Sequence, residues 1–165
     1  MNFAFEPGSL IVLVGGSGAG KTRLARRWPA TWRLCLDDYR AMATDDAADQ
    51  SATPVAARIQ DLLLDARLAR TLTTVIDSTA LMPHVRAHLL ARARYWQRPA
   101  CAVLLDVSLE RRRLLNSTRE RIVPDHILLD QERLLPTVED LLDEGFASVE
   151  RITGPVDLAP ARISR

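Results

Sequence analysis

The sequence of 165 residues has few cysteines, no long apolar run and almost no lysine. Its apolar runs, such as Leu10 to Val14, are far too short to cross a bilayer. Its first residues lack the basic and apolar regions of a signal peptide. These absences predict a cytoplasmic protein with no membrane contact. Cys35 and Cys101 each lie in an apolar stretch, which indicates buried free thiols and argues against a disulfide framework.

The charge of the chain is nearly balanced. The formal net charge is +1, so the sequence has no global basic field and any site for a polyanion must be local. The length is that of one domain. We therefore expect a single domain over residues 1–165, with a core from about residue 8 to 152 and an irregular tail over 153–165. The sequence does not indicate an oligomeric state.

Segments typical of strands and helices alternate along the chain. The expected strands cover residues 10–14, 33–36, 73–77, 100–106 and 147–152. Helices are expected over residues 21–28 and 83–96, and one long helix is expected over 124–145. Two further helices are expected to begin near residues 53 and 108. The polar stretch 37–53 is expected to be a loop with at most a turn of helix. This alternation predicts an α/β fold, with a parallel sheet, helices on both faces and a small helical lid.

The strongest motif lies between the first expected strand and the first expected helix. It matches the pattern G-x-x-x-x-G-K-[ST] and consists of Gly15, Gly16, Ser17, Gly18, Ala19, Gly20, Lys21 and Thr22. Its glycines allow backbone N–H groups to surround a phosphate at the start of a helix. Lys21 can bridge the β- and γ-phosphates, and the Thr22 hydroxyl can bind Mg²⁺. The motif predicts a P-loop NTPase-type sheet that binds ATP and Mg²⁺.

The only lysine of the sequence is Lys21, since the other 21 of its 22 basic residues are arginines. A compact ammonium fits between phosphates better than a planar guanidinium does. The composition therefore supports the assignment of the phosphate loop.

Acidic residues follow three expected strands, at Asp37, Asp77 and Asp106. The carboxyl ends of parallel strands form the ligand-binding edge of such a sheet. In the sequence Asp37-Asp38-Tyr39-Arg40, a carboxylate can accept a proton from an attacking hydroxyl. The arginine can bind an anionic part of the acceptor. Acidic residues after a strand also serve as helix caps or solvated loops.

Four segments together resemble the 5′-hydroxyl polynucleotide kinase family, in its bacteriophage and bacterial RNA-repair branches. They are the phosphate loop, the segment D-D-Y-R at 37–40, Val75-Ile76-Asp77-Ser78-Thr79, and Asn116-Ser117-Thr118-Arg119. The acidic segment 44–53 is similar to the kinase module of bacterial end-healing and end-sealing proteins. The resemblance extends from about Leu10 to Ile152. The phosphatase and ligase modules often fused to the bacterial kinase are absent from this sequence.

The resemblance implies a role for each matching residue. Asp37 matches the general base that activates a 5′-hydroxyl. Arg40 matches the arginine that binds an acceptor phosphate or steers the acceptor, and Asp77 matches an aspartate that organises the substrate site. Arg119 matches a lid arginine that reaches the donor phosphates in the transition state.

The sequence departs from the family pattern at two positions. Ala80 replaces a usual asparagine, and Leu115 stands where a second lid arginine is expected. Arg112, Arg113 and Arg121 are near enough to substitute. These departures concern the lid more than the reaction class.

The expected function is a polynucleotide 5′-hydroxyl kinase, which transfers the γ-phosphoryl group of ATP to a 5′-OH end of RNA or DNA. A small-molecule P-loop kinase acting on a sugar, nucleoside or antibiotic is an alternative that the near-neutral charge supports. A nucleotide-dependent switch or ATPase without an organic acceptor is a second alternative. Asp37 and Arg40 argue against it, because a switch needs no acceptor base.

Overall fold

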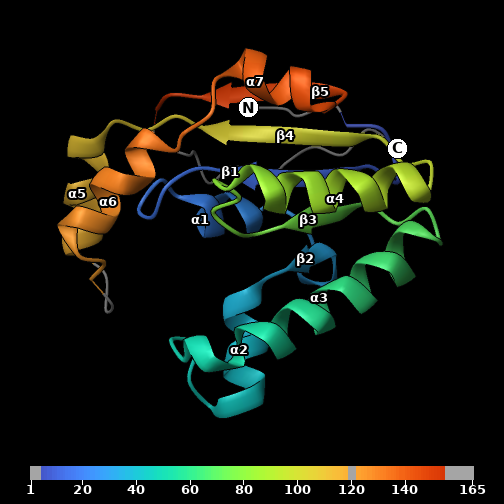
Figure 1. Cartoon of the computed structure of the whole chain (residues 1–165), viewed down its shortest axis with the longest axis horizontal. Helices are drawn as coiled ribbons and strands as arrows, with labels where there is room; N and C mark the ends of the chain where they lie inside the picture. The colour runs from blue at the N-terminus through green and yellow to red at the C-terminus, as the bar shows by residue number, and fades with distance from the viewer. Residues whose placement is uncertain (1–4, 119–121, 155–165) are drawn as a thin grey trace.

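The computed structural model describes residues 5–118 and 122–154, and these form a parallel sheet covered by helices (Figure 1). The sheet has the strand order β2-β3-β1-β4-β5. The strands are β1 (Leu10–Val14), β2 (Arg33–Leu34), β3 (Thr74–Ile76), β4 (Ala100–Leu105) and β5 (Ser148–Ile152). All four pairings are parallel. Every residue of β1, β3 and β4 is buried, as expected for strands covered on both faces.

Helices cover both faces of the sheet, which confirms the predicted fold class. They are α1 (Lys21–Ala25), α2 (Leu36–Thr44), α3 (Thr53–Leu68), α4 (Pro83–Tyr95), α5 (Leu109–Ser117), α6 (Asp125–Arg133) and α7 (Val138–Glu144), with short 3-10 turns at Ala30–Trp32 and Gln50–Ala52. Alternate residues of β1 contribute to two hydrophobic clusters. One cluster includes residues of α3, α4 and α7, and the other includes residues of α1.

Two helical regions lie outside the sheet, one at the carboxyl end of β4 and one beyond the β2 edge (Figure 1). In Figure 1, α5 and α6 gather at the end toward which the β4 arrow points, and α2 and α3 lie beyond β2 at the edge of the sheet. Ligands of open parallel sheets bind at the carboxyl ends of the strands. A ligand of the phosphate loop would therefore lie between these two regions.

The region after β2 differs from the sequence-based expectation. We expected residues 37–53 to be a loop, but residues 36–44 form helix α2. Asp37 and Asp38 lie in its first turn, where carboxylates interact favourably with the helix dipole. The helix ends at Asp45, which has a left-handed backbone with φ of 58°. The acidic residues that suggested a loop therefore stabilise the start of a helix.

The predicted long helix over 124–145 is also wrong. The structure has two helices there, because α6 ends at Arg133 and α7 begins at Val138. Pro136 lies between them and has no N–H for a continuous helix. Thr137 then starts α7 with a capping box, in which its hydroxyl accepts from the N–H of Asp140 and the Asp140 carboxylate accepts from the N–H of Thr137.

Two smaller expectations can be compared with the structure. Helix α1 ends at Ala25, three residues earlier than expected, and β2 has only two residues. Both cysteines are free and buried, as predicted. Within the described residues, we find no helix with the length and apolar character needed to cross a membrane.

Candidate active site

The phosphate loop connects β1 to α1 and is held by backbone contacts. The Gly15 N–H donates to the Thr79 carbonyl at 3.0 Å, which joins the loop to the segment after β3. Gly18 and Gly20 have φ values of 81° and 94°, a left-handed backbone that favours glycine. The glycine pattern of the motif therefore has a direct conformational cause.

Lys21 is buried against the same loop. Its ammonium donates to the carbonyl oxygens of Gly15 and Gly16, at 2.8 Å in both cases. These bonds hold the charge at the loop, where it can interact with the phosphates of a nucleotide. The sequence predicted this residue, although it could not predict its two carbonyl partners.

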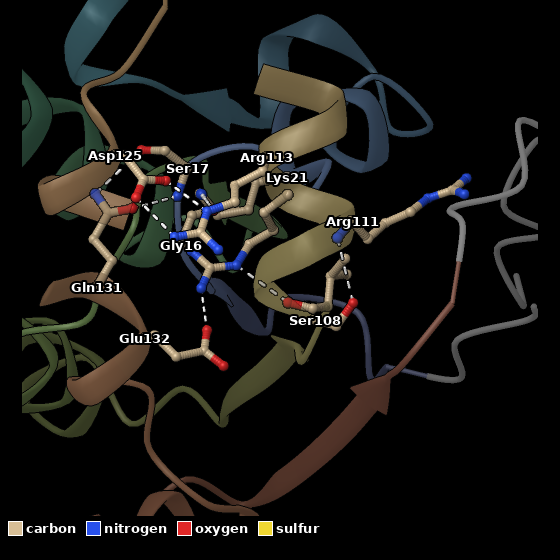
Figure 2. A network of polar contacts seen from close by, with 11 residues as sticks. Gly16, Ser17, Lys21, Ser108, Arg111, Arg113, Asp125, Gln131 and Glu132 are labelled. Atoms are coloured by element: carbon tan, nitrogen blue, oxygen red, sulfur yellow. Dashed lines mark hydrogen bonds and ion pairs between the residues drawn. The ribbon is translucent and has the colours of Figure 1, made fainter. Parts of the chain in front are cut away.

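Helix α6 contacts the opposite side of the loop, which the sequence analysis did not predict. The Ser17 N–H donates to Gln131 Oε1 at 2.7 Å, and Gln131 Nε2 donates to the Ser17 hydroxyl at 3.1 Å. Figure 2 shows the side chain of Gln131 directed toward Ser17 of the loop. Gln131 thus accepts a hydrogen bond from a backbone N–H of the phosphate-binding motif itself.

Arg112 on α5 is buried against the loop. Its Nε donates to the Val107 carbonyl at 3.1 Å, and its Nη2 pairs with Glu132 of α6. A Cβ atom on Gly16 would overlap Arg112 Nη1, and one on Gly18 would lie 2.8 Å from the Arg112 carbonyl oxygen. A larger residue at Gly18 would therefore meet backbone, and one at Gly16 would displace the end of the Arg112 side chain.

The other candidate lid arginine within the described residues is not placed against the phosphate loop as Arg112 is. Arg113 is half-exposed and binds Asp125 with both Nε and Nη2, at 2.6 and 2.7 Å. Arg119 and Arg121 lie outside the described residues. Leu115, at the expected position of the second lid arginine, is partly buried. Among Arg112 and Arg113, only Arg112 contacts the phosphate loop.

A chain of polar contacts connects the loop to helix α2. The Thr22 hydroxyl donates to Asp77 Oδ1 at 3.3 Å, and Arg33 Nη1 lies 3.2 Å from Asp77 Oδ2. The other end of the Arg33 guanidinium pairs with Asp38. Burial raises the pKa of the Asp77 carboxyl, and the hydrogen bonds from Arg33 and Thr22 act in the opposite direction. The structure thus brings Thr22 and Asp77 together, and Arg33 joins them to D-D-Y-R.

The pair of Thr22 and Asp77 suits a magnesium ion. A hydroxyl and a carboxylate are hard oxygen ligands, and Mg²⁺ in kinases usually takes only one or two protein oxygens together with phosphates and water. Within the described residues, no group of three or more His, Cys, Asp and Glu side chains could hold a metal ion. A metal at this position would therefore depend on the nucleotide for further ligands.

Asp37 and Arg40 form an ion pair one helical turn apart on α2. The Asp37 side chain is 62% exposed, whereas that of Arg40 is 9% exposed. Arg40 Nε also donates to the Ala47 carbonyl at 2.9 Å. The carboxylate is therefore accessible, while the guanidinium is used within the chain to join α2 to the loop after it.

Asp106, the third strand-end acid, contacts the edge of the sheet. It pairs with Arg151 of β5, with Nε and Oδ2 2.9 Å apart. This ion pair joins the ends of β4 and β5. The contact is consistent with a structural role.

Asn116 is bonded to Val123, on the other side of the segment that carries the expected lid residue Arg119. This buried residue donates from Nδ2 to the Val123 carbonyl at 2.8 Å and accepts from the Val123 N–H at Oδ1 at 2.9 Å. Asn116 therefore joins the backbone on the two sides of the segment that carries Arg119. Ala80, where an asparagine is usual, has φ of 44°, a conformation that asparagine tolerates better than alanine.

One family model matches most of the chain, over a range that includes the phosphate loop and α1. A model of the AAA_33 family, described as AAA domain, matches residues 10–137. The chain belongs to the AAA_33 family. None of the curated proteins compared with this AAA_33 chain matches it.

Solved structures share the P-loop kinase-type fold of this AAA_33 chain. A chain of the Pnkp1/Rnl/Hen1 complex is 20% identical with a TM-score of 0.59, and the match covers 75% of this chain but only 43% of that chain. Kti12 from Chaetomium thermophilum, in complex with ADP-AlF3, is 16% identical, with 87% and 88% covered and a TM-score of 0.61. A gluconokinase from Sinorhizobium meliloti is 19% identical, with 93% and 87% covered and a TM-score of 0.56. At these identities the likeness concerns the fold alone.

Proposed function

We propose that the chain is a cytoplasmic polynucleotide 5′-hydroxyl kinase, which uses ATP and Mg²⁺ to phosphorylate a 5′-OH end of RNA or DNA. The observation that supports this best is the position of D-D-Y-R. Asp37 is exposed in the first turn of α2, and its neighbour Asp38 is connected through Arg33 and Asp77 to Thr22 of the phosphate loop. This arrangement supports a role for Asp37 as an accessible base on the same side of the sheet as the donor loop.

In the proposed reaction, the 5′-hydroxyl oxygen attacks the γ-phosphorus of ATP. A new P–O bond forms, the bond to the β-phosphate oxygen breaks, and ADP leaves. Asp37 accepts the hydroxyl proton, and Lys21 stabilises the charge that spreads over the transferring group. Thr22, with Asp77 nearby, would hold Mg²⁺, which would supply further charge neutralisation. Arg119, outside the described residues, retains its proposed role in the lid.

One observation favours a small-molecule kinase as a second candidate. Arg40, the residue expected to bind an acceptor phosphate, is buried and already bonded to Asp37 and the Ala47 carbonyl. Gripping an acceptor phosphate would require Arg40 to exchange its contact with Asp37. A kinase whose acceptor lacks phosphates would need no such exchange.

The acceptor is tested with γ-labelled ATP and four acceptors offered in parallel. They are an oligonucleotide with a 5′-OH, the same oligonucleotide with a 5′-phosphate, a free nucleoside and a sugar. We expect no label on the 5′-phosphate oligonucleotide or the sugar, and at least about tenfold poorer labelling of the free nucleoside than of the 5′-OH oligonucleotide, because the nucleoside lacks an acceptor phosphate. Equal labelling of nucleoside and oligonucleotide would support the small-molecule kinase. Release of phosphate without labelled product would support an ATPase.

A further inference from the structure

Two hydrogen-bond donors lie where the phosphate loop faces α5 and α6. The Ser17 N–H already has a partner, and Arg112 Nη1 has none within the described residues. The Ser17 N–H is bonded to Gln131 Oε1 at 2.7 Å. Arg112 Nη1, which lies against Gly16, is buried and has no hydrogen-bond partner within the described residues. We propose that Arg112 binds a donor phosphate and that Gln131 occupies the Ser17 N–H until a phosphate oxygen displaces it. This deepens the proposed function and rests on its nucleotide donor.

The unpaired Nη1 atom of Arg112 supports the binding of an anion at this position. Leaving a buried charged donor unsatisfied costs more than leaving a neutral one unsatisfied. The guanidinium has two other anchors, since Nε is bonded to the Val107 carbonyl and Nη2 to Glu132. These anchors fix its plane and leave Nη1 facing the loop at Gly16. A phosphate oxygen there would satisfy the remaining donor with a charge-assisted hydrogen bond.

Gln131 provides the second observation. A P-loop binds phosphate through backbone N–H groups, and the carboxamide oxygen of Gln131 accepts from one of them as a phosphate oxygen would. The Gln131 oxygen is neutral, so its bond is weaker than that of an anionic phosphate oxygen. A nucleotide therefore displaces the side chain at a small cost. Gln131 then acts as a competitor that lowers the apparent affinity for the nucleotide.

A purely structural role of Arg112 has to be separated from phosphate binding, because Arg112 also joins α5 to α6 through Glu132. Arg113 supplies the matched control, since it joins the same two helices through Asp125 and is half-exposed. A structural role predicts loss of stability for both variants. Phosphate binding predicts loss of triphosphate affinity for the Arg112 variant alone.

The test measures binding of ATP and of AMP by calorimetry, without any acceptor. We expect Arg112→Met to weaken ATP binding by about 10- to 100-fold, the range for losing a hydrogen bond to a charged group. AMP binding should change less than about threefold, and Arg113→Met should leave both affinities within about twofold of the wild type. ATP affinities of Arg112→Met and Arg113→Met within twofold of each other would overturn the role of Arg112.

Gln131 is tested in the same assay and does not depend on the folding of the Arg112 variant. Gln131→Ala should strengthen ATP binding a few-fold because the competitor is removed. Gln131→Glu should weaken it, because a carboxylate binds the Ser17 N–H more strongly and repels phosphate. Unchanged or weaker ATP binding by Gln131→Ala would overturn its role as a competitor. Since no acceptor is present, these results are independent of whether the acceptor is a nucleic acid.

Discussion

The proposed donor and acceptor sides of the site are held by different kinds of contact. On the donor side, Lys21 is bonded to two backbone carbonyls within the loop and Arg112 is buried against it. On the acceptor side, Asp37 and Asp38 are held by ion pairs with Arg40 and Arg33, and the Asp37 side chain is 62% exposed. The carboxylates of these pairs are exposed or half-exposed, so salt screens the pairs more than it screens the buried contacts of the loop. The donor loop is therefore preorganised, whereas the acceptor side can adjust to its ligand.

The largest expected effect follows from removing the charge of the donor loop. Lys21→Ala should lower kcat for phosphoryl transfer by at least about a thousandfold, because the ammonium that follows the migrating phosphoryl group is lost. Lys21→Arg should rescue little, since the wider guanidinium does not fit beside the two carbonyls. Steady-state kinetics with saturating ATP measure both variants. A kcat within tenfold of the wild type would contradict the donor-site assignment.

The second prediction concerns the acceptor side. Asp37→Asn keeps the shape of the side chain but removes the base, so transfer to the acceptor should fall by at least about a hundredfold. ATP affinity should stay within about threefold, because Asp37 makes no described contact with the phosphate loop. Measuring kcat and ATP binding on one preparation separates these two effects.

Asp38→Asn is the matched control for Asp37. Asp38 is half-exposed and bonded to Arg33, so its loss weakens the connection to Asp77 without removing the proposed base. We expect a smaller fall in kcat than for Asp37→Asn. An essential Asp38 beside a dispensable Asp37 would reverse the roles assigned to the two acids.

The donor loop could be predicted from the sequence because it is local. Five consecutive apolar residues followed by G-x-x-x-x-G-K-[ST] specify a buried strand, a turn and a helix start within about 16 residues. The contact between Gln131 and Ser17 joins residues 114 apart, and no local pattern specifies such a contact. Its position depends on how α5 and α6 pack against the loop, which the sequence alone did not indicate.

Two errors in the secondary structure have different origins. The break between α6 and α7 was readable, because Pro136 interrupts the helical pattern and Thr137 with Asp140 forms a capping box. Helix α2 was harder to predict, since the same acidic residues occur in solvated loops and in first helical turns. Burial of Tyr39 and Arg40 on one side of α2 distinguishes the two, and burial is a property of the fold.

A third prediction tests the base of the segment between α5 and α6. Asn116→Ala removes two hydrogen bonds to the backbone of Val123 and should lower the free energy of unfolding by about 1–3 kcal/mol. Asn116→Asp keeps the acceptor but directs a buried carboxylate oxygen at the Val123 carbonyl, so at neutral pH it should destabilise at least as much as Asn116→Ala. Urea denaturation measures both variants. Equal stability of Asn116→Ala and the wild type would show that these bonds do not hold the segment.

The last prediction uses one cysteine from each region to compare their local stability. Cys35 precedes α2 on the acceptor side, and Cys101 lies in β4 between β1 and β5. Both are buried, so a thiol reagent reaches either one only when the structure opens locally. Strand β2 has two residues and lies at the edge of the sheet. We expect Cys35 to be alkylated at least about tenfold faster than Cys101, because opening beside a short edge strand breaks fewer contacts.

The effect of salt on the two alkylation rates tests the same difference, and we expect it to be the smallest effect. Burial raises the pKa of the Cys35 thiol to about 11, so the thiolate is scarce near neutral pH and alkylation depends on opening of this region. Raising the salt concentration from about 0.05 to about 1 M screens the ion pairs of Asp37 and Asp38. Alkylation of Cys35 should therefore accelerate about two- to threefold, while that of Cys101 should not change. Mass spectrometry of the alkylated peptides measures both rates in one sample. If Cys101 reacted first, or if salt accelerated both cysteines equally, the two regions would not differ in how they are held.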